Sequence, residues 1–255
     1  MYLGQLLDDG VAAATCTRQG LAVIDYQSAM GDEEAEDRVC GACCALAEQL
    51  LATADDVAEV EDECDQLLRR AAESDPRSAE PLQVLASLRS QQGRAEEALE
   101  ALRRSVATWR SRRGGRDVDP DADLDDDADE DRADEHLGEY EVSYEFRFET
   151  AKLLLELDES VDEAVGVLEE LLNERDDVVD VWQLLALANH GGCNFDRALE
   201  LVTHAEQLNE RQGGDEATHA NLMELRLAIE ESKDCLLYTS PSPRDLSTSR
   251  MPSSA

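Results

Sequence analysis

The feature that most constrains the fold is a repeat of small residues at helical spacing. Ala151 and Ala186 stand 35 residues apart, and Ala164 and Ala198 stand 34 apart. Around each of them, Ala, Leu and Glu recur at three- and four-residue steps, the spacing of an amphipathic helix. A unit of this length holds two helices, which bury their apolar faces only by stacking on neighbouring units. The sequence therefore predicts an all-α solenoid of antiparallel helix pairs.

The unit resembles the tetratricopeptide repeat, in which Trp, Leu and small residues occupy fixed positions of a helix pair of about 34 residues. Trp182-x2-Leu185-Ala186 fits the first helix of that pattern, and Ala198-x3-Val202 fits the second. This resemblance implies a right-handed superhelix with an extended concave surface. Eleven residues are predicted to form the repeat core: Leu46, Ala47, Leu85, Ala86, Ala98, Ala151, Ala164, Trp182, Leu185, Ala186 and Ala198.

Shifts in composition divide the chain into four parts. Residues 1–110 are predicted to hold tetratricopeptide repeats, the first of them truncated, because 2–4 resemble the end of a first helix whose partner is 11–26. A spacer at 55–60 separates the helices of the next repeat. Residues 111–138 are predicted to be a disordered acidic loop, and 139–234 to hold the C-terminal repeats. We therefore expect the chain to begin within a repeat of a longer protein.

The last 21 residues, 235–255, abandon the acidic helical composition. The stretch "CLLYTSPSPRD" (235–245) can be back-translated into a sequence resembling a transposase-type sequencing adaptor, and 249–255 fit its distal end. We expect a non-native, disordered tail that is excluded from the core. The alternative is a natural tail rich in Ser and Pro.

The charge balance limits the possible partners. The chain has 60 Asp and Glu against 23 Lys and Arg, a net charge of −37 and a pI near 4.2. The electric field of this net negative charge repels nucleic acids and anionic membranes and attracts cationic polypeptides. No apolar run reaches the roughly 20 residues of a membrane span, and the N-terminus lacks a signal-peptide pattern. We expect an intracellular protein with a basic protein partner.

Other motifs were weighed against simpler roles. Asp119 to Glu130 match the ligand positions of an EF-hand loop, but Leu124 replaces the required Gly, so a solvated or cation-binding loop is favoured over a calcium site. Zinc ligation by Cys40-x2-Cys43-Cys44 or His190-x2-Cys193 is less favoured than reduced, partly buried thiols.

The basic run 110–116 is expected to flank a helix C-terminus or to pair with the acids, with nuclear import as the alternative. No nucleophile, phosphate-binding or dinucleotide motif is present. We therefore predict no enzyme, no cofactor and no catalytic or metal-binding residues.

The helical phase of the first helices predicts which residues line the concave surface and bind the partner. They are Glu48, Glu80, Glu149, Asp180 and Gln183.

Several stretches resemble the dedicated assembly chaperones of the large-subunit ribosomal protein L-four. They are "YLGQL" (2–6), the run 72–109 with "DPRSAEPLQVLAS" at its start, "ETAKLLLEL" (149–157) and "DDVVDVWQLLALA" (176–188). The resemblance implies one chain wrapped around the cationic extension of one newly made ribosomal protein. That client would be shielded from nucleic acid in the cytoplasm and nucleus. The rival hypotheses are a general repeat scaffold that holds peptide segments, and an enzyme whose catalytic part lies upstream.

Overall fold

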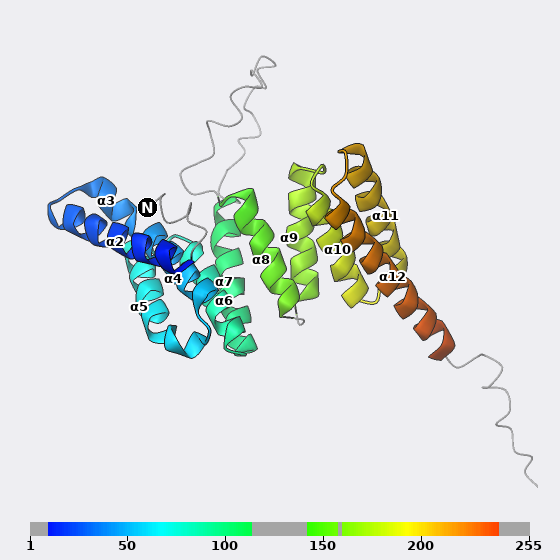
Figure 1. Ribbon diagram of the computed structural model, residues 1–255, viewed down its shortest axis with the longest axis horizontal. Helices are drawn as coiled ribbons and strands as arrows, with labels where there is room; N and C mark the ends of the chain where they lie inside the picture. The colour runs from blue at the N-terminus through cyan, green and yellow to red at the C-terminus, as the bar shows by residue number, and fades with distance from the viewer. Residues whose placement is uncertain (1–9, 114–141, 158–159, 240–255) are drawn as a thin grey trace, which may run out of the picture. The chain divides into compact units, whose positions relative to one another are not determined.

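The computed structural model describes residues 10–113, 142–157 and 160–239, in which helices alternate with short turns and no strand occurs (Figure 1). The fold is a tetratricopeptide-type helical solenoid. Most of the predicted acidic loop lies outside the described residues. The chain divides into two compact units, Met1–Ser160 and Val161–Ala255, and each is described by itself.

The first unit contains the helices α2 to α8. In chain order they are α2 (Gly10–Ala29), α3 (Glu33–Asp37), α4 (Val39–Thr53), the 3-10 turn η1 (Val57–Glu59), α5 (Glu61–Ser74), α6 (Glu80–Gln91), α7 (Ala95–Arg113) and α8 (Tyr144–Glu156). Helices α4 and α5 pack as one pair and α6 and α7 as the next. Helix α4 also packs on α6, and α6 on α8, so the first helices of successive repeats are neighbours.

The second unit contains α9 (Val161–Glu174), α10 (Val179–Gly191), α11 (Phe195–Arg211) and α12 (Glu216–Thr239). Helices α10 and α11 form the pair predicted around Trp182, with α9 on one side and α12 on the other. None of the helices in the described ranges combines the length and apolar composition that a membrane crossing requires.

Small residues let the paired helices approach closely. Ala47, Ala86, Ala98 and Ala186 are at most 1% exposed, and fully buried leucines such as Leu88 fill the spaces between them. Of the eleven residues expected in the repeat core, nine are buried, because their helical phase turns them toward the neighbouring helix. The core is therefore distributed along the repeats, as stacking of short helix pairs requires.

The other two expected core residues, Leu85 and Trp182, are half-buried. Leu85 packs against the edge of the α4–α6 core. The indole N–H of Trp182 donates to the carbonyl of Asp176 at 2.8 Å, and its ring centroid lies 4.0 Å from that of His204. A buried indole N–H needs an acceptor, and the position at the rim supplies one.

Two of the turns within repeats share one hydrogen-bond pattern. At the end of α6, Gly93 has a φ of +72°, and the N–H of Arg94 donates to the carbonyl of Arg89 at 2.9 Å. At the end of α10, Cys193 has a φ of +59°, and the Asn194 N–H donates to the Asn189 carbonyl at 2.8 Å. Both are Schellman turns, which favour glycine at the left-handed position. Only the turn at the end of α6 has a glycine at that position.

Two predicted boundaries differ from the observed helices. Helix α7 continues to Arg113, three residues into the segment predicted to be a loop, because no helix breaker occurs before Gly114. Helix α12 continues to Thr239, so residues 235–239 are helical where a disordered tail was predicted. The two leucines at 236 and 237 are strong helix formers, and the first helix-breaking Pro comes only at 241.

Candidate functional site

Three of the predicted partner-binding carboxylates belong to the first unit. Glu48 lies on α4, Glu80 on α6 and Glu149 on α8, which are the first helices of successive repeats. All three residues are exposed. We call Glu48, Glu80 and Glu149 the acidic face.

The carboxylates of the acidic face are close enough to repel one another. Incomplete hydration raises the pKa of Glu48, and the negative charges of Glu80 and Glu149 raise it further. The same loss of hydration, followed by the charge of Asp75, raises the pKa of Glu80. Protein atoms therefore surround these exposed groups on enough sides to reduce their hydration. A cation placed among them would relieve both effects.

Neither Glu48 nor Glu80 has a cationic partner within ion-pairing distance in the described part of the chain. Other acids of this unit do have one. Glu63 on α5 pairs with Arg18 at 2.7 Å, and Asp65 pairs with Arg89 at 2.8 Å. Glu63 and Asp65 on the second helix α5 are thus neutralised within the unit, whereas Glu48 and Glu80 of the acidic face are left for an external cation.

Glu149 is the exception on this face. Lys152, one turn further along α8, lies 2.8 Å from its carboxylate. The pair is exposed on both sides, so its contribution to stability is small. A competing cationic chain would have to displace only a weak partner.

A small polar contact joins the helices that carry Glu80 and Glu149. The buried side chain of Gln83 on α6 donates to the carbonyl of Phe146 on α8 at 3.4 Å, and the hydroxyl of Thr150 lies 3.4 Å from the Gln83 amide oxygen. These contacts fix α8 against α6. They were not predicted from the sequence, although Gln83 falls on the buried side of α6 with Val84 and Ala86.

The remaining two predicted contact residues belong to the second unit. Asp180 lies exposed in the first turn of α10, and Gln183 follows one turn later, half-buried. They share one stretch of helix surface with each other.

The structure also places the other candidate motifs. His190 and Cys193 do not converge on a common point: the His190 Nε2 lies 3.0 Å from the Ser232 hydroxyl, whereas Cys193 is exposed at the turn. Arg110 lies over the ring of Trp109, 5.3 Å from its centroid, and belongs to the last turn of α7. The EF-hand-like stretch lies outside the described residues. Burial raises the pKa of the Cys64 thiol to about 11, which keeps it protonated.

Comparisons with known proteins agree with this architecture. No model of a known protein family matches the chain. A curated relative from Schizosaccharomyces pombe, described as "Probable assembly chaperone of rpl4", is 27% identical over 187 residues. The match covers 72% of this chain and 49% of the relative, so the chain spans about half the length of that protein.

Two solved structures share the fold. One is "Assembly Chaperone of RpL4 (Acl4) (Residues 1-338)", with a TM-score of 0.52, 24% identity, and coverage of 74% of this chain and 65% of that one. The other is BtubC (BKLC) from P. vanneervenii, with a TM-score of 0.56, 15% identity and coverage of 95% of both chains. At these identities the structures support the fold alone. The chain is a tetratricopeptide-type solenoid that is similar, over most of its length, to a probable assembly chaperone of rpl4.

Proposed function

We propose that this protein is an assembly chaperone that binds and shields a ribosomal protein of the rpl4 kind. The observation that carries the proposal is the acidic face, which has carboxylates on three successive first helices. Incomplete hydration and the charges of Glu80 and Glu149 disfavour the ionised form of Glu48, and neither Glu48 nor Glu80 has a cationic partner among the described residues. The relative described as a probable assembly chaperone of rpl4 supplies the class of client.

Binding follows from the electrostatics of the face. Lys and Arg side chains of a cationic segment would enter the field of Glu48, Glu80 and Glu149 and remove the repulsion among them. Asp180 and Gln183 on the second unit would contact the same client. The excess of 60 acidic over 23 basic residues speeds the encounter with a cationic chain and repels competing RNA.

Release needs no chemical step in this account. The phosphates of ribosomal RNA offer the cationic segment a denser negative charge than the protein does, so RNA would displace the chaperone at the assembly site. The proposal therefore includes no catalysis, cofactor or nucleotide. It places the protein in the cytoplasm and nucleus, as a monomer that binds one client.

The test is a pull-down from a eukaryotic lysate with the tagged chain at increasing salt, followed by mass spectrometry. We expect one dominant basic ribosomal protein that is lost when the salt approaches molar concentration, because the Debye length then shrinks to about 3 Å. A set of neutral proteins retained at high salt would instead support the general scaffold. Adding ribosomal RNA to the captured complex tests release directly.

A further inference from the structure

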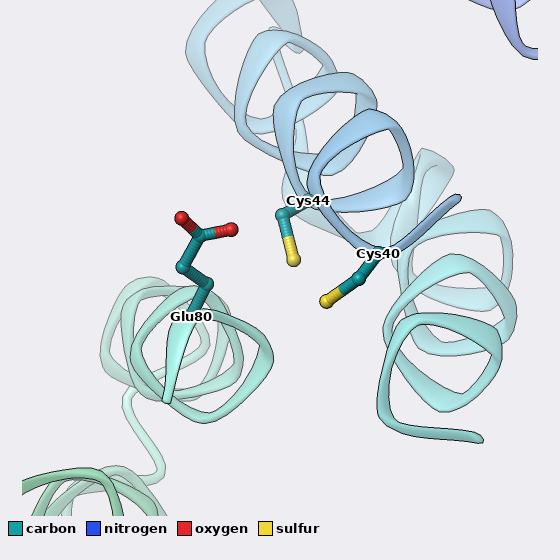
Figure 2. Close-up of side chains that lie close together, drawn as sticks. All are labelled: Cys40, Cys44 and Glu80. Atoms are coloured by element: carbon teal, nitrogen blue, oxygen red, sulfur yellow. The ribbon is translucent and has the colours of Figure 1, made fainter. Parts of the chain in front are cut away.

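A cluster of two thiols and one carboxylate lies between α4 and α6. The Sγ atoms of Cys40 and Cys44 and a carboxylate oxygen of Glu80 all lie within 4.8 Å of one another. Figure 2 shows the two thiols side by side on α4, with Glu80 reaching toward them from α6. Both cysteines are buried, at 5% and 3% exposure, whereas Glu80 is exposed.

Local structure explains why these three side chains converge. Cys40 and Cys44 are four residues apart on one helix, so they share a face. Glu80 is the first residue of α6, and the packing of α6 on α4 brings it opposite that face. Cys40 also lies in the first turn of α4. Both helix starts carry partial positive charge, which favours a thiolate and a carboxylate there.

Cys43 lies between these cysteines in the sequence but belongs to a different environment. It is fully buried, and its sulfur is not among the ligand atoms that lie within 4.8 Å of one another. The set that converges is therefore Cys40-x3-Cys44 with Glu80. Of the three cysteines in the Cys40-x2-Cys43-Cys44 motif, for which the sequence favoured reduced thiols over zinc, the fold brings Cys40 and Cys44 together with Glu80 and leaves Cys43 out.

The geometry of the cluster suits a cation. Two sulfur atoms and one carboxylate oxygen from two helices lie within 4.8 Å of one another, close enough to be bridged by a single ion. A divalent cation stabilises two thiolates and one carboxylate together.

We propose that Cys40, Cys44 and Glu80 form a Zn²⁺ site that links the first helices of two successive repeats. Two sulfur ligands and one oxygen ligand suit zinc, which prefers thiolates and accepts carboxylates in tetrahedral sites. A hard cation such as Mg²⁺ would not select thiols. Water completes the fourth position on the side where Glu80 is exposed, and with zinc bound the client's cations meet Glu48 and Glu149 instead of Glu80.

The test is a Co²⁺ titration of the reduced full chain, since Co²⁺ replaces Zn²⁺ in thiolate sites and makes them visible. We expect thiolate-to-cobalt charge-transfer absorption that saturates at one Co²⁺ per chain and disappears when Zn²⁺ is added. Cys40→Ala and Cys44→Ala are each expected to abolish this absorption. Glu80→Gln is expected to weaken Co²⁺ binding by at least about tenfold, because the loss of a ligand should cost no less than the loss of a group that only orients one.

Cys43→Ala is the matched control, because it removes a buried thiol from the same turn of α4 but none of the ligands. It is expected to keep the full absorption. Circular dichroism of each variant shows whether it still folds, which separates loss of a ligand from loss of the fold. Glu80→Gln is useful here because it removes a ligand at an exposed position.

Zinc should also raise the melting temperature Tm of the wild type and of Cys43→Ala by several degrees, since a ligand that binds only the folded state stabilises it. It should leave Cys44→Ala unchanged. Equal absorption in the Cys40→Ala/Cys44→Ala double variant, or none in the wild type, would overturn the site. The measurement needs no client, so its failure leaves the proposed function untouched.

Discussion

Glu48 shows at the scale of one residue how function and stability oppose each other in this protein. Its carboxylate is poorly hydrated and faces the charges of Glu80 and Glu149, so its ionised form is disfavoured in the folded protein. Retaining such a group costs the free protein stability. The cost is offset only if a cation binds there.

The first prediction concerns the removal of that charge. Glu48→Gln is expected to raise the stability of the free protein by up to about 0.5 kcal/mol, within the usual range for a surface change. This corresponds to a rise in Tm of about 1–2 °C for a chain of this size. The affinity for the cationic client should fall about fivefold, because one attractive charge is lost. Differential scanning calorimetry and titration calorimetry measure the two effects.

Glu200→Gln is the matched control for this prediction. Glu200 is an exposed helical acid that pairs with Arg197 at 3.0 Å and lies outside the acidic face. Its replacement should raise neither the Tm nor the client dissociation constant. A destabilised Glu48→Gln variant would contradict the assignment of repulsion at this site.

The second prediction is a pH dependence with opposite signs for stability and binding. The pKa values of Glu48 and Glu80 are raised in the folded state, so the folded protein binds protons more tightly than the unfolded chain does. As the pH falls through these raised values toward the ordinary carboxyl range, the contribution of both groups to stability increases. Client affinity should decrease over the same interval.

The sign is checked by comparing Tm between wild type and the Glu48→Gln/Glu80→Gln double variant. The double variant should be the more stable at neutral pH, and the difference should shrink as the pH is lowered. A difference that grows on acidification would show that these carboxylates are stabilised by ionisation in the folded state.

At the scale of the helical element, the turns that end α6 and α10 offer a reciprocal test. Gly93 and Cys193 occupy the same left-handed position of equivalent Schellman turns, and a Cβ at Gly93 would meet no neighbouring atom. Any cost at these positions therefore comes from the backbone conformation itself.

Gly93→Ala is expected to destabilise the protein by about 1 kcal/mol, and Cys193→Gly to stabilise it by a similar amount. Gly191→Ala is the control, because Gly191 is helical and has free space around its Cβ position. That variant should be neutral or slightly stabilising. Urea denaturation of the three variants gives the free energies of unfolding, and the same sign for Gly93→Ala and Cys193→Gly would refute the comparison.

Much of the helical architecture was predictable because it depends on local information. The positions of Ala47, Ala86 and Ala186 predict which face of each helix carries small residues and can pack closely on a neighbouring helix. These three alanines are buried. The η1 turn was anticipated only as a spacer between two helices. The continuation of α12 to Thr239 was not predicted, because the change in composition at residue 235 indicated the end of the helical part although no helix breaker occurs there.

The candidate site was harder to predict, because it depends on distances across helices. Helical phase predicted Glu48, Glu80 and Glu149, but it could not predict the repulsion at Glu48 or the lack of a cationic partner for Glu48 and Glu80 among the described residues. The Gln83–Thr150 contact and the convergence of Cys40, Cys44 and Glu80 join residues far apart in the chain. Periodicity cannot show which first-helix residues face one another until the repeats are stacked.

At the scale of the whole molecule, the net charge of −37 is expected to govern binding kinetics as well as affinity. Long-range attraction should make association with a cationic client fast at low salt and much slower at high salt. Stopped-flow mixing at two ionic strengths measures this directly. An association rate that does not change with salt would mean that the acid serves only solvation.

The most direct test of the central claim is titration calorimetry of the purified chain with a purified rpl4-type ribosomal protein. The wild type should bind with one-to-one stoichiometry and an affinity that decreases as salt is raised. The Glu48→Gln/Glu80→Gln/Glu149→Gln triple variant should bind about a hundredfold more weakly and depend less on salt, since three attractive charges are lost. Absent binding, or equal binding by wild type and triple variant at all salt concentrations, would contradict the assignment of the acidic face.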